Sequence, residues 1–205
     1  MKRCSCWIIV GLLVLMSMPT SEVAALMEEG RTAIYKVTHH STAGDLESFT
    51  TYSLAGLTDA GYWLQRTVHM QRPETQPLSI TQNLLDAASH QPLRYIKYRP
   101  AKMGRPANAI DLPLEEMGKD EIFPTPATDA FNDAGNLDVP AGVFAAQVAE
   151  VGKFTIWINP DVPVLGVVKV EAPDWTMELF RIEPQAVDLL PNKPPKGGMA
   201  YVEEE

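Results

Sequence analysis

The sequence predicts a mainly β protein, built as one antiparallel sheet and preceded by an export signal. Several segments alternate apolar and polar residues with a period of two, which is the pattern of a half-buried strand. The chain is interrupted at short intervals by 17 prolines and 13 glycines. Few windows hold a helical pattern, and no internal repeat is present. The 180 residues after the signal are enough for a single domain with a sizeable core.

The first 25 residues have the three parts of a secretory signal. Lys2 and Arg3 give a positive start, an apolar run covers Trp7–Met18, and Val23-Ala24-Ala25 offers small residues for a signal peptidase. The run is shorter than the roughly 20 residues of a membrane-spanning helix. We therefore expect cleavage after Ala25 and a periplasmic or secreted protein. An uncleaved inner-membrane anchor is the alternative, and it would be the only expected membrane contact.

The composition of the mature chain restricts its chemistry and its partners. Cys4 and Cys6 lie inside the signal, so we expect no disulfide, thiolate metal site or cysteine nucleophile after cleavage. Without Lys2, Arg3 and Glu22, 15 basic and 25 acidic residues remain, a net charge of −10. This balance argues against nucleic acid and anionic lipid surfaces, because both bind clustered positive charge. It is typical of a soluble protein.

About nine strands are expected between the signal and residue 183. Turn signals separate them as an antiparallel meander requires, with hairpin corners at Asp59-Ala60-Gly61 and at 150–153. The strands are predicted, in chain order, at 31–38, 48–54, 62–70, 78–84, 93–99, 143–151, 154–158, 167–171 and 177–182.

Two segments lack this alternation. Residues 100–138 contain five prolines, with a short helix predicted over Leu112–Met117, capped by Asp111, and another helical turn over Thr128–Ala134. A long irregular connection of this kind is either a lid over the sheet or a solvent-exposed loop. Residues 191–205 combine prolines, glycines and a final acidic run, so we predict a disordered acidic tail and a folded domain over 26–190.

A stiff corner is predicted between the strands at 154–158 and 167–171. Pro160 and Pro163 cannot donate ladder hydrogen bonds, so the first strand must end by Asn159. Asn-Pro-Asp is a turn signal, and Gly166 allows a bulge or a close approach before Val167. The two strands should therefore be antiparallel neighbours.

The stretches "VPAGVFAAQVAE", "TIWINPDVPVLGVVKVE" and "MELFRIE" resemble the C-terminal half of exported bacterial domains of unknown function. Those domains are similar to the periplasmic lipoprotein-carrier half-barrels of the LolA/LolB type. The resemblance covers 139–183 well and is generic over 31–99. It implies a mainly β fold: a single curved antiparallel sheet (half-barrel) with one or two short helices or a lid loop on an apolar concave face. The family often has a cysteine or polar residue where this chain has Ala145 and Ala146.

No motif for catalysis or metal binding is present. His39 and His40 are adjacent on a strand, so they point to opposite faces and cannot easily share a metal without His69 or a carboxylate nearby. Nucleophile, phosphate-loop and zinc-protease signatures are missing. The grouped carboxylates, such as Glu115 with Glu116, fall in loop-like sequence. We therefore expect a protein that is not an enzyme and needs no cofactor or metal.

The resemblance implies that the protein carries a lipid or lipidated protein by burying an acyl chain on its concave face. Strand residues that could line such a site are Tyr35, Val37, Leu64, Val68, Tyr95, Phe154, Ile156 and Ile158. Aromatic residues on strands also serve as ordinary core, and this alternative stays open. A second alternative is an interaction or structural module of the cell envelope, which would dock a protein partner through a sheet edge or its tail.

Overall fold

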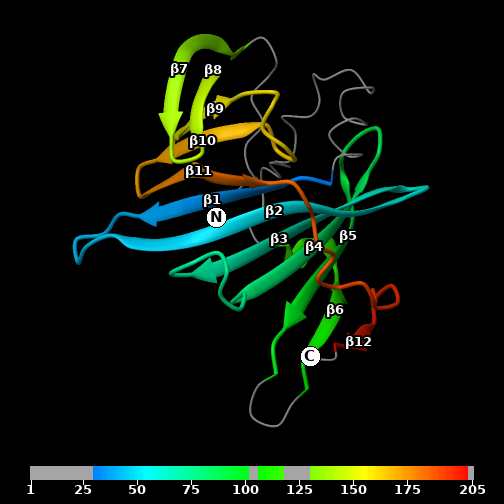
Figure 1. Cartoon of the computed structure of the whole chain (residues 1–205). Helices are drawn as coiled ribbons and strands as arrows, with labels where there is room; N and C mark the ends of the chain where they lie inside the picture. Colours follow the sequence, from blue (N-terminus) through cyan, green and yellow to red (C-terminus); the bar gives the residue numbers. More distant parts are fainter. Residues whose placement is uncertain (1–29, 102–105, 118–129, 203–205) are drawn as a thin grey trace, which may run out of the picture.

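The structure is a computed structural model that describes residues 30–101, 106–117 and 130–202. These residues form one open antiparallel sheet, in the order β12-β6-β5-β4-β3-β2-β1-β11-β10-β9-β8-β7 (Figure 1). The single curved antiparallel sheet predicted from the sequence is therefore confirmed. The predicted signal at 1–25 lies outside the described residues. The strands are β1 (Thr32–His39), β2 (Leu46–Thr58), β3 (Gly61–Met70), β4 (Ser79–Asp86), β5 (Pro92–Arg99), β6 (Asn108–Leu112), β7 (Asn132–Val139), β8 (Gly142–Val151), β9 (Phe154–Ile158), β10 (Val167–Ala172), β11 (Trp175–Glu183) and β12 (Met199–Tyr201).

Short turns join most neighbouring strands. Both predicted hairpin corners are confirmed, because Thr58 pairs with Gly61 across β2 and β3, and Val151 pairs with Phe154 across β8 and β9. Gly152 has φ +63° in the second of these turns, a backbone conformation that glycine adopts without steric cost. The meander therefore follows the turn chemistry of the sequence.

The two faces of the sheet are covered in different ways. We call the face of Tyr35, Tyr62 and Leu64 the inner face, and the face of Trp63 and Gln65 the outer face. The inner face packs against the curled β9–β10 end of the sheet to form the main core. The outer face carries a smaller core around Trp63, which is covered by the segment 184–202 running back across the sheet. We call residues 184–198 of this segment the strap.

The structure corrects several sequence predictions. Residues 100–138 contain β6 and β7 instead of a continuous irregular lid. β6 is short and β7 is polar, and each forms a strand by pairing with its neighbour, β6 with β5 and β7 with β8. The helix predicted over Leu112–Met117 is a single 3-10 turn, η2 (Leu114–Glu116), which follows Pro113. Asp111 is a buried residue of β6, not a helix cap. The helical turn predicted over Thr128–Ala134 is wrong from 132 onward, where β7 begins, and 118–129 lie outside the described residues.

The tail differs most from its prediction. Residues 191–202 are ordered, and β12 pairs with β6 in register Met199–Ile110 and Tyr201–Asn108. Disorder was predicted because the segment has little apolar area of its own. Its order comes instead from polar contacts with the sheet, which composition does not reveal. Among the described residues, no helix is long or apolar enough to span a bilayer.

Candidate functional site

The predicted ligand-lining residues converge, but they are largely covered. Tyr35, Val37, Leu64 and Ile156 are buried in the main core, with Phe154 and Ile158 half-buried against it. Tyr95 is buried as well, whereas Val68 is only half-buried, and neither belongs to this cluster. Within the described residues, six of the eight side chains therefore belong to or pack against one apolar cluster on the inner face.

The corner at 159–166 packs onto the inner face. Val162, Val164 and Leu165 of this corner are 0%, 4% and 6% exposed and pack into the main core. The predicted corner is confirmed, since Ile158 pairs with Val167 and β9 and β10 are antiparallel neighbours. A register shift between Val167 and Lys169 also places a bulge beside Gly166. The resemblance implies one or two short helices or a lid loop on this face; the corner places an apolar turn on it, and residues 102–105 and 118–129 of the predicted lid segment lie outside the described residues.

Both ends of the corner are fixed, while its middle is strained. Asn159 donates its backbone N–H to the Gly166 carbonyl at 2.8 Å and its side-chain amide to the Ala145 carbonyl at 2.7 Å. Between these anchors, Leu165 donates its N–H to the Pro163 carbonyl across Val164, whose φ is +71°. Positive φ is rare for a β-branched residue and stores about 1–3 kcal/mol. Val162 also donates its N–H to the Asn159 carbonyl at 3.1 Å and accepts the Gly166 N–H at 3.2 Å, so the loop has hydrogen bonds of its own between the two strands.

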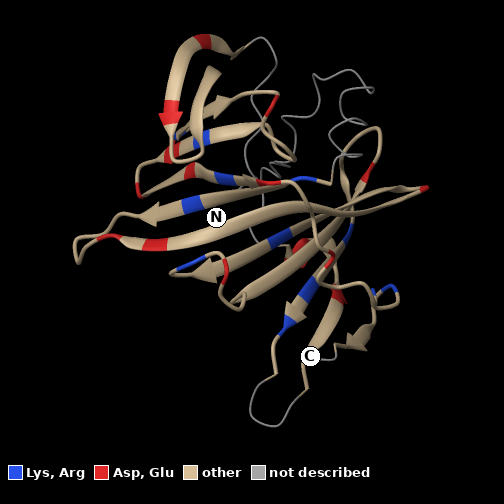
Figure 2. Ribbon diagram, viewed as in Figure 1, with Lys and Arg blue, Asp and Glu red and all other residues tan. Residues whose placement is uncertain are grey.

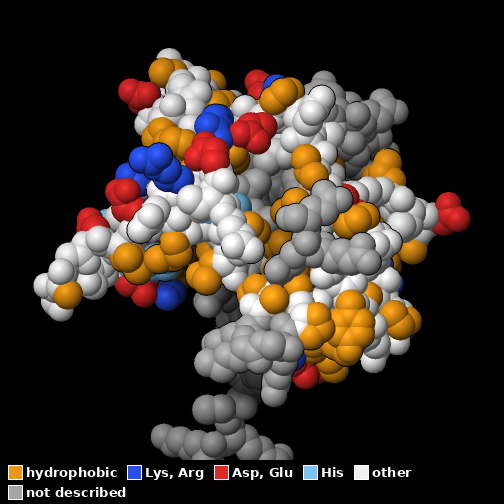
Figure 3. Space-filling model, turned by 60° about the horizontal axis from the view of Figure 1, so that its bottom comes forward, with side chains coloured by type: hydrophobic (Ala, Val, Ile, Leu, Met, Phe, Trp, Pro, Cys, Tyr) orange, Lys and Arg blue, Asp and Glu red, His pale blue; other side chains and the backbone are white. Residues whose placement is uncertain are grey.

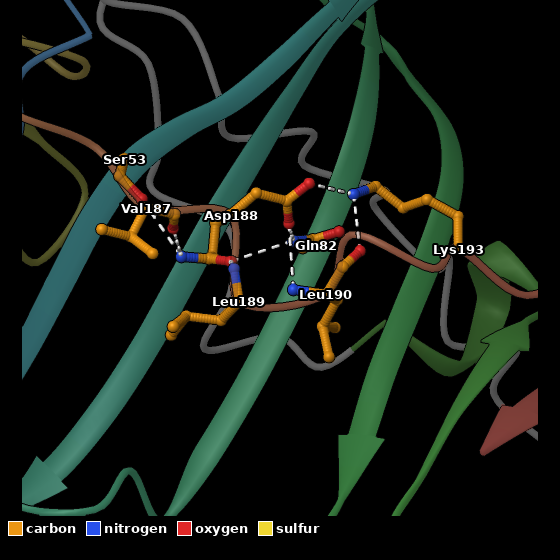
Figure 4. A network of polar contacts seen from close by, with 8 residues as sticks. Ser53, Gln82, Val187, Asp188, Leu189, Leu190 and Lys193 are labelled. Carbon is orange, nitrogen blue, oxygen red and sulfur yellow. Dashed lines mark hydrogen bonds and ion pairs between the residues drawn. The ribbon is translucent and has the colours of Figure 1, made fainter. Parts of the chain in front are cut away.

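On the outer face, a buried polar network fastens the strap to the sheet (Figure 4). Gln65 donates to the Val187 carbonyl at 2.9 Å and accepts the Leu189 N–H at 2.9 Å. Gln82, which is fully buried, donates to Gln65 Oε1 at 2.9 Å and to Asp188 Oδ1 at 2.7 Å. Lys193 closes the network with an ion pair of 2.7 Å to Asp188.

A second fastening lies at the far end of the strap. Asp111 accepts hydrogen bonds from Arg94 at 3.0 Å and from the Gly197 N–H at 2.8 Å. Arg94 also donates to the Pro194 carbonyl at 2.8 Å. The guanidinium of Arg94 and the ammonium of Lys193 lie 5.4 and 5.2 Å from the Trp63 ring, within cation–π range. The strap is therefore held mainly by polar and charged groups.

A pocket of about 220 Å³ lies on the outer face beside the strap. Its floor consists of two cross-strand rows on β11, β1, β2 and β3, namely Glu183–Thr32–Ser53–Gln65 and Arg181–Ile34–Thr51–Thr67. His69 extends the floor, the β3–β4 loop supplies Pro73 and Glu74, and the strap supplies Gln185, Val187 and Leu189. The sequence analysis missed this pocket; the alternation within β3 (Gly61–Met70), which places Gln65, Thr67 and His69 on one face, is the signal that could have pointed to it.

The pocket floor is ordered by its own hydrogen bonds. His69 is buried, with Nδ1 2.7 Å from the Thr75 carbonyl and Nε2 2.9 Å from the Thr67 hydroxyl. A carbonyl only accepts, so Nδ1 carries a proton, and a neutral ring accepts from Thr67. At the rim, Arg181 binds Glu74 at 2.9 Å and Glu183 at 2.8 Å.

Figure 2 shows charges of both signs dispersed over the fold.

The other titratable groups lie apart from the pocket. His40 contacts Asp45 at 3.1 Å through one ring nitrogen and the Thr176 hydroxyl at 3.0 Å through the other. A carboxylate, an imidazole and a hydroxyl are linked in the same sequence in nucleophilic triads. However, the His40 and Asp45 side chains are 46% and 57% exposed, and the outer-face pocket does not include them. Burial raises the pKa of Tyr35. Within the described ranges, no cluster of His, Cys, Asp and Glu is arranged to hold a metal ion.

Comparisons with known proteins give little further guidance. No family model matches the chain, and no curated protein is significantly similar to it. One similar solved structure is a protein from Bacteroides fragilis that has a YmcC-like fold and is thought to be exported. It shares 13% identity and a TM-score of 0.36, over 76% of this chain and 96% of that chain. Such a likeness assigns no role to any residue here, and the resemblance to the LolA/LolB type stays a prediction.

Proposed function

We propose that this protein is an exported, non-catalytic envelope protein that binds an apolar group, such as the acyl chain of a lipid or lipidated protein, on its inner face. One observation supports this proposal above the others: six of the eight predicted ligand residues meet in one apolar cluster that the 159–166 corner completes. In the form described here, the corner takes the place of the ligand. Binding requires Val162, Val164 and Leu165 to leave the core.

The cost of this opening sets the kind of ligand. Exposing three aliphatic side chains costs on the order of 5–9 kcal/mol, at about 1.5–3 kcal/mol for each. Each buried methylene of a ligand contributes about 0.8 kcal/mol, so about six to eleven methylenes are needed to offset the opening. Relief of the strain at Val164 lowers the requirement. Long acyl chains should therefore bind, and short ones should not.

The test is lipid binding by the mature protein. Native mass spectrometry and lipid extraction should find co-purified lipid, and palmitate should displace a fluorescent fatty-acid probe where butyrate fails. Val162→Ala weakens the closed form by about 1.5 kcal/mol, so it should bind the probe about tenfold more tightly. Val143→Ala, at an exposed position of β8, is the matched control and should change nothing. The proposal is refuted if no lipid co-purifies and neither the natural chain nor Val162→Ala binds the probe.

An interaction module of the envelope is the second candidate, and the open ends of the sheet favour it. β12 is an edge strand that leaves Met199 48% and Tyr201 64% exposed, and Leu93 of nearby β5 is also exposed. Figure 3 shows apolar side chains gathered on the side where β5, β6 and β12 lie. Deleting the tail would also remove β12 and the strap contacts. Met199→Ser with Tyr201→Ser is therefore the better test: capture of an envelope partner should fall while acyl binding persists.

A further inference from the structure

The outer-face pocket is a second concave site, independent of the apolar interior. It lies on the opposite face of the sheet, so opening of the 159–166 corner is not needed to reach it. Its floor is built from polar side chains that are themselves buried: Ser53, Gln65 and Thr67 are each 3% exposed. Burying polar groups costs free energy unless they are hydrogen-bonded. A floor of buried polar side chains is therefore more than an irregularity of the surface.

We propose that this pocket binds one small, neutral, hydroxyl-rich unit, of the kind a single sugar residue presents. The first argument is size. About 220 Å³ is less than the roughly 300–1,000 Å³ typical of sites for drug-sized ligands, so the pocket suits one compact ring. An extended chain or a large cofactor would not fit within it.

The second argument is charge. The rim holds Arg181 between Glu74 and Glu183, and the guanidinium binds both carboxylates. The excess negative charge disfavours an anionic ligand. A cationic ligand would have to replace Arg181 in its ion pairs. A neutral ligand meets neither obstacle.

The third argument is the set of polar atoms that remain for a ligand. Gln65 is saturated, because its amide donates to Ser53 and Val187 and its oxygen accepts from Gln82 and Leu189. The Ser53 hydroxyl accepts from Gln65, which leaves its proton to donate.

These groups complement hydroxyls, which both donate and accept. Ser53 offers a donor, while each rim carboxylate has a second oxygen that can accept. Ile34, Val187 and Leu189 add apolar contacts suited to the C–H face of a ring. The strap supplies two of these three residues, and Gln65 ties the strap backbone to the floor. Ligand and strap therefore share one polar scaffold.

The experiment is an NMR titration of the uniformly ¹⁵N-labelled mature protein with glucose, galactose and N-acetylglucosamine, and with citrate and lysine as charged probes. We expect at least one sugar to give saturable shifts at the amides of the two floor rows and of 185–189, with a millimolar or lower Kd. Thr51→Met fills the pocket without removing any hydrogen bond described above and should weaken binding at least tenfold. Thr38→Met, on the same face of β1 but outside the pocket, should leave it unchanged.

Several results would overturn the inference. Absence of saturable shifts with every sugar would do so, as would shifts that persist unchanged in Thr51→Met. Saturable binding of citrate or lysine in place of the sugars would show that the ligand class is wrong. If Thr51→Met fails to fold, Gln185→Trp obstructs the pocket from the exposed strap and should have the same effect. None of these outcomes bears on acyl binding at the inner face.

Discussion

At Gly61, the first residue of β3, the backbone of β4 comes so close that no residue with a side chain should be tolerated. A Cβ built there would lie 1.7 Å from the Leu85 carbonyl oxygen and 2.8 Å from its carbon, both backbone atoms of the neighbouring strand. Gly56 is a matched control, because its φ of +158° is almost that of Gly61 at +156°, yet nothing lies within 4 Å of its Cβ position. The pair of alanine variants therefore separates backbone strain from steric overlap.

Gly56→Ala should cost about 1–3 kcal/mol, the price of an unfavourable backbone conformation. Gly61→Ala should cost at least about 2 kcal/mol more, because β3 and β4 must move apart to admit the methyl group. Urea denaturation at 25 °C measures both free energies of unfolding. With an m-value of about 2 kcal/mol/M, the midpoint of Gly61→Ala should lie about 1 M below that of Gly56→Ala. Midpoints that agree within about 0.2 M would show that the close approach is not present in solution.

Two further predictions concern buried polar groups. Asp188→Ala removes one of the two acceptors of the fully buried Gln82 amide and of the Lys193 ammonium, so stability should fall by about 1–3 kcal/mol and hydrogen exchange over 184–202 should accelerate. Asp188→Asn keeps an acceptor oxygen and should cost less, and equal losses would contradict the network. His90 bonds the Tyr62 hydroxyl at 2.8 Å, and burial lowers the pKa of His90 below its usual 6.5, although nearby Asp86 opposes the shift. The neutral ring therefore stabilises the fold above pH 6.5, and this contribution is lost as pH falls through the lowered pKa. His90→Asn tolerates the local φ of +55° and should flatten the fall in stability as pH drops below 6.5; an unchanged slope would assign this fall to other groups.

Strands with a clear period of two could be predicted from sequence, and so could the corner at 159–166. Proline cannot donate a ladder hydrogen bond, so the strand must end before Pro160. The β-branched residues on both sides of Asn-Pro-Asp favour strands over helices there. β7 could not be predicted, because "NDAGNLDV" has the composition of a loop and becomes a strand only through its pairing with β8. β12 has three residues and depends on β6 in the same way.

One part of the candidate sites could also be predicted from the sequence, and another part could not. The apolar inner face was visible as alternation, since Tyr35, Leu64 and Ile156 each occupy the apolar phase of a strand. Its closure by Val162 and Leu165 was not visible, because sequence does not show which face a turn folds onto. The outer-face pocket needs residues from four strands and the strap, whose proximity arises only from the order β11-β1-β2-β3.

The pairing of β1 with β11 joins Thr32 to Glu183, and among the strands that the structure describes it is the one ladder that connects the β2–β6 and β7–β10 parts of the sheet. Every other ladder except β12–β6 joins strands that follow one another in the chain. A ribosome or a translocon must therefore deliver almost the entire polypeptide before the two halves can unite, and pairings so distant in sequence form slowly. The ladders within each part join consecutive strands and can form earlier, so we expect the union of the two parts to be the slow step of folding.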